Sequence, residues 1–90
     1  MTEAEPTFRD NPDEFRYELH LDGRLIGRID YRVQPDGVAL VHTEIDPPYR
    51  GRGLGTRLVA AAVRDLRERD LGIIAICPFV TAYLRRHPGN

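Results

Sequence analysis

The hydrophobic pattern of this chain changes its period once, at a glycine-rich stretch of residues 50–56. Before this stretch, apolar and polar residues alternate over residues 15–22 and again over residues 25–33, which is the period of half-buried β-strands. After it, apolar residues recur on one helical face over residues 54–69. The chain is therefore predicted to place strands first and to follow them with a long amphipathic helix.

Turn signals and apolar runs complete the predicted order of elements. Glycine-containing turns at residues 22–23 and 34–37 separate antiparallel strands, because glycine accepts the positive φ that tight turns need. Residues 38–45 start apolar on both faces, which favours a central strand. A short apolar run at 73–77 predicts a buried parallel strand, and residues 79–86 a second short helix. The order is β-β-β-α-β-α, with one right-handed crossover.

Length and charge limit the number of domains and the kinds of partner. Ninety residues make one domain, predicted over residues 14–90, while residues 1–13 are acidic, carry two prolines and are predicted to be a mobile tail. A net charge of −1 predicts no nucleic-acid partner and no membrane attachment. The acidic start has no apolar run and the chain has one cysteine, so a cytoplasmic location is expected.

Missing residue types exclude several chemistries. The chain has no serine, which excludes a Ser-His-Asp hydrolase. It has no lysine, which excludes a Walker-type phosphate lysine and Schiff-base catalysis. A single cysteine cannot build a multi-cysteine zinc site, and no metal is expected.

The glycine-rich stretch is placed to bind an anion. It follows a predicted strand and starts a predicted helix, whose first N–H groups are unpaired and carry partial positive charge. Gly51, Gly53 and Gly55 lack side chains that would block a phosphate, and Arg50 and Arg52 add charge. The sequence therefore predicts a phosphate or pyrophosphate site, the alternative being a tight connection only.

Residues 45–58 resemble the coenzyme-A-binding motif of the GNAT superfamily of acetyltransferases, which reads Arg or Gln, two residues, Gly, one residue, then Gly or Ala. A second match looks like the signature of a small stand-alone branch of the superfamily. It consists of Cys77-Pro78-Phe79-Val80, Tyr83, Arg85-Arg86 and His87-Pro88. The resemblance covers residues 15–88. It implies a minimal GNAT fold, an α/β (α+β sandwich-like) domain with a mixed, mainly antiparallel sheet. Full-size members have early helices and late strands around the acceptor pocket, and neither is predicted within residues 15–88.

The same resemblance implies where the cofactor, acetyl-coenzyme A, would bind. In this superfamily the strand before the loop and the strand after the helix splay apart, and the pantetheine arm enters between them. The implied cofactor-binding residues are Thr43, Ile45, Arg50, Gly51, Arg52, Gly53, Leu54, Gly55, Thr56, Cys77, Phe79, Tyr83 and Arg86.

His42 and Glu44 are the first candidates for catalysis. They are two residues apart on one strand and therefore share a face. A histidine titrates near neutral pH and can take a proton from an ammonium group, while Glu44 orients it or acts through water. The alternative is that both are polar residues satisfied at a strand end. His20, on the polar side of its strand, is expected to be solvated.

Cys77 and Tyr83 are the other candidates. A Cys77 thiolate beside His42 could accept the acetyl group before passing it on, although buried cysteines are usually inert. The resemblance implies that Tyr83 protonates the departing coenzyme A thiolate, and the alternative is an aromatic ring packed on the sheet.

The sequence thus predicts an N-acetyltransferase that moves an acetyl group from acetyl-coenzyme A to an amine. A protein lysine, an N-terminal amine, a polyamine and a small metabolite all stay open as acceptors. So do a monomer and a homodimer. The alternative function is a non-catalytic module that binds coenzyme A or acyl-coenzyme A. A nucleic-acid-binding domain is disfavoured by the near-neutral charge.

Overall fold

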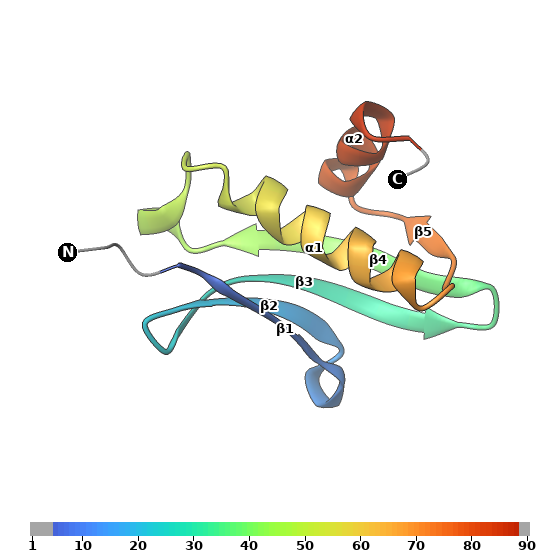
Figure 1. The fold of residues 1–90 in the computed structure, drawn as a ribbon, viewed down its shortest axis with the longest axis horizontal. Coiled ribbons are helices and arrows are strands. Elements are labelled where there is room, and N and C mark those ends of the chain that lie inside the picture. Colours follow the sequence, from blue (N-terminus) through green and yellow to red (C-terminus); the bar gives the residue numbers. More distant parts are fainter. Residues whose placement is uncertain (1–4, 89–90) are drawn as a thin grey trace.

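A computed structural model of the chain describes residues 5–88 and shows one mixed five-stranded sheet with two helices (Figure 1). The strand order is β1-β2-β3-β4-β5, antiparallel up to β4 and parallel between β4 and β5. The predicted α/β class with one parallel crossover is confirmed. The elements are β1 (Thr7–Asn11), η1 (Pro12–Glu14, a 3₁₀ turn), β2 (Arg16–Leu21), β3 (Arg24–Gln34), β4 (Gly37–Ile45), η2 (Pro47–Tyr49, also 3₁₀), α1 (Leu54–Glu68), β5 (Ile73–Ala75) and α2 (Pro78–Arg86).

The first strand is a correction to the sequence analysis. Residues 1–13 were predicted to be a mobile tail, but β1 pairs antiparallel with β2 along its whole length. Phe8 stacks on Tyr17 with ring centroids 5.2 Å apart, and Asp10 accepts a 2.6 Å hydrogen bond from the Tyr31 hydroxyl. A five-residue edge strand whose one apolar residue is Phe8 is too short to show an alternating pattern in the sequence. Residues 1–4 of the predicted tail lie outside the described residues.

Three apolar residues predicted to be buried are exposed instead, and one of them is Ile76, which follows the end of β5 and is 59% exposed. Phe15 is 59% exposed and Val33 is 70% exposed. Phe15 has a left-handed backbone (φ 54°) just before β2, so it falls outside the alternation of that strand. Val33 lies near the end of β3, where the β3–β4 hairpin projects past α1 (Figure 1).

The core lies between α1 and one face of the sheet. The predicted apolar face of α1 is fully buried, and it packs against side chains of β2, β3 and β4 such as Tyr17, Ile29 and Leu40. The buried residues of this helix are Leu54, Leu58, Val59, Ala62, Val63 and Leu66. Among residues 5–88, no helix is both long and apolar enough to cross a membrane.

The sheet splits between β4 and β5. The two strands pair only from Val38 to Leu40, and the backbone oxygen of Leu40 accepts hydrogen bonds from both Ile76 N and Cys77 N, at 3.1 and 2.9 Å. β5 has then ended, whereas β4 continues to Ile45. The β3–β4 register also shifts beside Leu40, where Val41 is left without an opposite residue. The second half of β4 therefore has no β5 neighbour, which is the splayed arrangement that the resemblance implies.

Candidate active site

The glycine-rich loop leaves the first turn of α1 open. Gly51 and Gly53 have left-handed backbones (φ 79° and 75°), and a Cβ at either position would have no atom within 4 Å. Gly53 is the N-cap of α1 and supplies no capping side chain. The unpaired N–H groups of the first helical turn are therefore reachable from solvent, which suits a phosphate group. Gly55 serves packing, because a Cβ there would lie 3.1 Å from the Phe79 ring.

A cleft of about 510 Å³ joins this loop to the unpaired end of β4. It brings together most of the predicted cofactor and catalytic residues. These are His42, Thr43, Glu44, Ile45, Arg50, Gly51, Gly53, Leu54, Gly55, Thr56 and Phe79. Thr56 and Phe79 also line a smaller cavity of about 140 Å³ between α1 and α2, together with the predicted Tyr83 and Arg86. The two hollows therefore adjoin along α1.

His42 and Glu44 form a hydrogen-bonded pair in the lining of the cleft. His42 Nε2 lies 2.8 Å from Glu44 Oε1. The hydrogen bond from His42, together with the guanidinium of Arg28, holds the pKa of Glu44 below its usual range. An ionised carboxylate only accepts hydrogen bonds, so His42 donates through Nε2 and its Nδ1 is left to take a proton. In this arrangement His42 could act as a general base, and Glu44 would orient its ring.

Cys77 faces Thr43 across the split between β4 and β5. The Thr43 Oγ1 to Cys77 Sγ distance is 3.5 Å, and Cys77 is only 5% exposed. Burial opposes ionisation of the thiol, but hydrogen bonds from the Thr43 side chain and from the backbone of Val80 and Phe79 lower the pKa of Cys77 overall. Neighbouring residues of a strand point to opposite faces, so Thr43 and Cys77 lie on the helix side of the sheet and His42 on the other.

Tyr83 lies away from the His42–Glu44 pair. Its ring stacks on the ring of His87, with centroids 4.3 Å apart, and packs against the core. It lines the cavity between α1 and α2 rather than the cleft that holds His42 and Glu44. Of the four candidate catalytic residues, the structure therefore joins two directly and places Cys77 and Tyr83 in separate surroundings.

Comparison with known proteins identifies the family. Residues 16–90 match the profile of the family described as GCN5-related N-acetyl-transferase.

The chain belongs to this family.

Protein NATD1 of chicken and of mouse each share 37% identity with the chain over 51 residues. This match covers 57% of the chain and 46% of each relative, so it spans less than half the length of these curated relatives. A ribosomal-protein-alanine N-acetyltransferase from Brucella melitensis has the same fold, with a TM-score of 0.66 and 15% identity over 83% of this chain and 61% of that one. A GCN5-like protein from Staphylococcus aureus gives a TM-score of 0.65 and 27% identity over 96% of this chain and 82% of that one.

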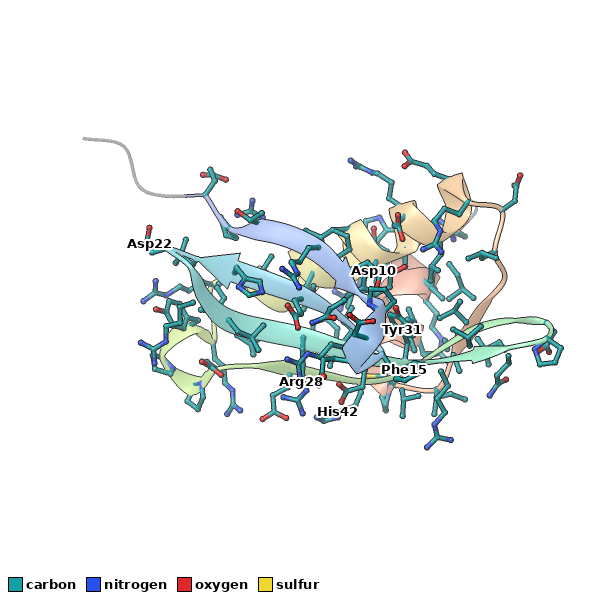
Figure 2. The ribbon with its side chains drawn as sticks, turned by 90° about the horizontal axis from the view of Figure 1, so that it is seen from below. Asp10, Phe15, Asp22, Arg28, Tyr31 and His42 are labelled. Atoms are coloured by element: carbon teal, nitrogen blue, oxygen red, sulfur yellow. The ribbon has the colours of Figure 1, made fainter. Side chains whose placement is uncertain are left out.

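Sequence analysis of this GCN5-related chain missed Arg28 and Tyr49. Arg28 on β3 stands directly opposite Glu44, with Nη2 3.9 Å from Oε1, and Figure 2 labels it near His42. Tyr49 lines the cleft and lies under the Arg52 guanidinium, 5.6 Å from its ring centroid. The alternation of β3 gives the face of Arg28, but its partner on β4 depends on the register shift beside Val41, which has no signal in the sequence.

Proposed function

We propose that this member of the GCN5-related family transfers an acetyl group from acetyl-coenzyme A to an amine. The observation that carries the proposal is that one cleft of about 510 Å³ holds both an open helix N-terminus and the His42–Glu44 pair. The first is suited to a pyrophosphate, and the second to removing a proton from an ammonium group.

The loop and the split would hold the two ends of acetyl-coenzyme A. We assign the pyrophosphate to the backbone N–H groups around Gly51 and Gly53 and to the guanidinium of Arg52. The part of β4 from Thr43 to Ile45, which has no β5 partner, is assigned to the pantetheine arm. Phe79, Tyr83 and Arg86, with Leu54, Gly55 and Thr56 on the α1 side, complete the proposed cofactor surface.

The placement of the side chains supports direct transfer. His42 takes a proton from the acceptor ammonium at Nδ1, and Glu44 stabilises the imidazolium that forms. The free amine attacks the thioester carbonyl, a C–N bond forms, the C–S bond breaks with its electron pair going to sulfur, and the nitrogen releases its surplus proton to solvent. The coenzyme A thiolate then takes a proton from solvent, either directly or through Tyr83, which solvent reprotonates. Transfer through an acetylated Cys77 is the alternative, and it is disfavoured because Cys77 and His42 lie on opposite sides of the sheet.

Thermal unfolding with acetyl-coenzyme A tests the cofactor site. At 100 times its dissociation constant a ligand adds about 2.7 kcal/mol to stability, which is on the order of ten degrees in Tm for a domain of this size. Gly53→Glu, which places a carboxylate at the loop, is expected to abolish the shift.

Gly23→Glu is the matched control for this substitution. Gly23 has almost the same backbone (φ 76°) and the same open surroundings, but it lies in the β2–β3 turn. This variant is expected to lose the same backbone stability and to keep the shift. A wild-type protein that shows no shift at millimolar acetyl-coenzyme A would contradict the proposal.

A further inference from the structure

Arg50, the first residue of the glycine-rich loop, is turned back toward the His42–Glu44 pair. Its Nε donates a 2.9 Å hydrogen bond to the backbone oxygen of Ile45. Its Nη2 lies 3.9 Å from Glu44 Oε2. The side chain, although 59% exposed, thus connects the loop to Glu44 and Ile45 at the end of β4.

Glu44 is consequently surrounded by groups from three elements. His42, from β4 itself, bonds Oε1 at 2.8 Å. From β3, Arg28 lies 3.9 Å from the same oxygen, and its Nε is bonded to Asp30. Only Arg50, from the loop, approaches the other oxygen, Oε2. Among the described residues, these are the charged and titratable groups that face this carboxylate.

Arg52, two residues along the same loop, behaves differently. Its guanidinium lies over the Tyr49 ring, 5.6 Å from the centroid, and the ion pairs of Glu44 are with Arg28, His42 and Arg50. The loop therefore carries two arginines with different neighbours. Arg50 is hydrogen-bonded to the end of β4, and Arg52 lies over the ring of Tyr49 in η2.

We propose that Arg50 is a positioning residue, which holds Glu44 against His42 through its hydrogen bond to Ile45 O and its contact with Oε2. This inference rests on the proposed function for the role of His42. Binding of the pyrophosphate stays assigned to Arg52 and the N–H groups of the loop. Both contacts are made by one planar guanidinium, which presents several donors in a fixed fork. A lysine keeps the charge but cannot make the two contacts together.

The first test needs neither cofactor nor turnover. The titration of Glu44 is followed by carboxyl NMR in the wild type, Arg50→Gln and Arg52→Gln. Arg50→Gln removes a cation and frees the carboxylate from its partner, so both effects raise the pKa of Glu44 toward its ordinary value. Arg52→Gln is expected to leave this titration in place. An unmoved titration in Arg50→Gln, or an equal change in both variants, would overturn the proposal.

Kinetics with acetyl-coenzyme A give the second test. Arg50→Gln is expected to lower kcat about tenfold, with no rescue by Arg50→Lys and no further loss in a Glu44→Gln background. Arg52→Gln is expected to raise KM for acetyl-coenzyme A. The positioning role would be overturned if Arg50→Lys restored kcat, or if Arg50→Gln lowered kcat tenfold in the Glu44→Gln background as well. A wild-type protein without turnover would count against the proposed function alone, because the NMR titration still decides the role of Arg50.

Discussion

Two histidine–glutamate pairs lie on the same open face of the sheet, one on β2 and one on β4. In each pair the two residues are two positions apart and the distance from His Nε2 to Glu Oε1 is 2.8 Å, for His20 with Glu18 and for His42 with Glu44. The two carboxylates even share a row of the sheet, because Arg28 stands opposite both of them. Residue types and local geometry are therefore the same at the two sites.

The two pairs differ in how far neighbouring strands bury them. The side chain of Glu18 is 3% exposed, whereas that of Glu44 is 42% exposed. β1 is the strand next to Glu18 in the sheet, and Asn11 of β1 donates a 2.9 Å hydrogen bond to the Glu18 carboxylate. Arg16 adds another at 2.7 Å. The β4 pair has no such neighbour, since β5 has already diverged. The comparison indicates that strand cover, more than residue type, makes one pair structural and leaves the other able to meet a substrate.

The largest expected effect is a difference in kcat between variants of the two histidines. His42→Ala removes the proposed base and is expected to lower kcat by a factor of about 10² to 10⁴. His20→Ala removes a partner of buried Glu18 and is expected to change kcat by less than about twofold while lowering the free energy of unfolding. Steady-state kinetics and urea unfolding on both variants check this. Equal losses of activity in the two variants would break the comparison.

The next largest effect is a difference between the two glutamates in how much each contributes to the free energy of unfolding. Burial opposes ionisation of Glu18, but hydrogen bonds from His20, Arg16 and Asn11 lower its pKa to about 2. Glu18→Gln weakens charge-assisted hydrogen bonds to a buried side chain whose partner Arg16 is 27% exposed, so we expect it to lower the free energy of unfolding by about 2 kcal/mol. The matched Glu44→Gln is expected to stay within about 0.5 kcal/mol of the wild type.

The pH dependence of unfolding provides the control for Glu18. Its folded pKa is lower than the unfolded value of about 4.3, so its contribution is fully present above that value and is lost as the pH falls through about 2. Urea unfolding between pH 5 and pH 2 is expected to show this loss in the wild type and a smaller one in Glu18→Gln. An identical pH dependence in both would show that Glu18 is not held as an anion.

The parts of the molecule that sequence analysis predicted correctly are those with local signals. The buried face of α1 follows from helical spacing, and the open turn at Gly51 and Gly53 follows from glycines between a strand and a helix. His42 and Glu44 were paired because residues two apart on a strand share a face. Each of these inferences needs only a few consecutive residues.

The missed features depend on contacts between separate segments. β1 exists because it pairs with β2, and His20, which was expected to be solvated, is 26% exposed and is hydrogen-bonded to buried Glu18. Arg28 reaches Glu44 only in a register that includes an unpaired residue on β4. The direction of Arg50 depends on where the end of β4 lies relative to the loop, which local spacing does not contain.

Acetyl transfer itself is the most direct test of the proposed function. The protein is incubated with acetyl-coenzyme A and a panel of amines (a lysine peptide, a peptide with a free N-terminus, a polyamine and a small primary amine), and the amide product and free coenzyme A are measured by mass spectrometry. We predict an amide product with at least one class of amine, which His42→Ala abolishes while the thermal shift with acetyl-coenzyme A is retained. Binding of acetyl-coenzyme A without product from any class would contradict the account and favour a non-catalytic binding module.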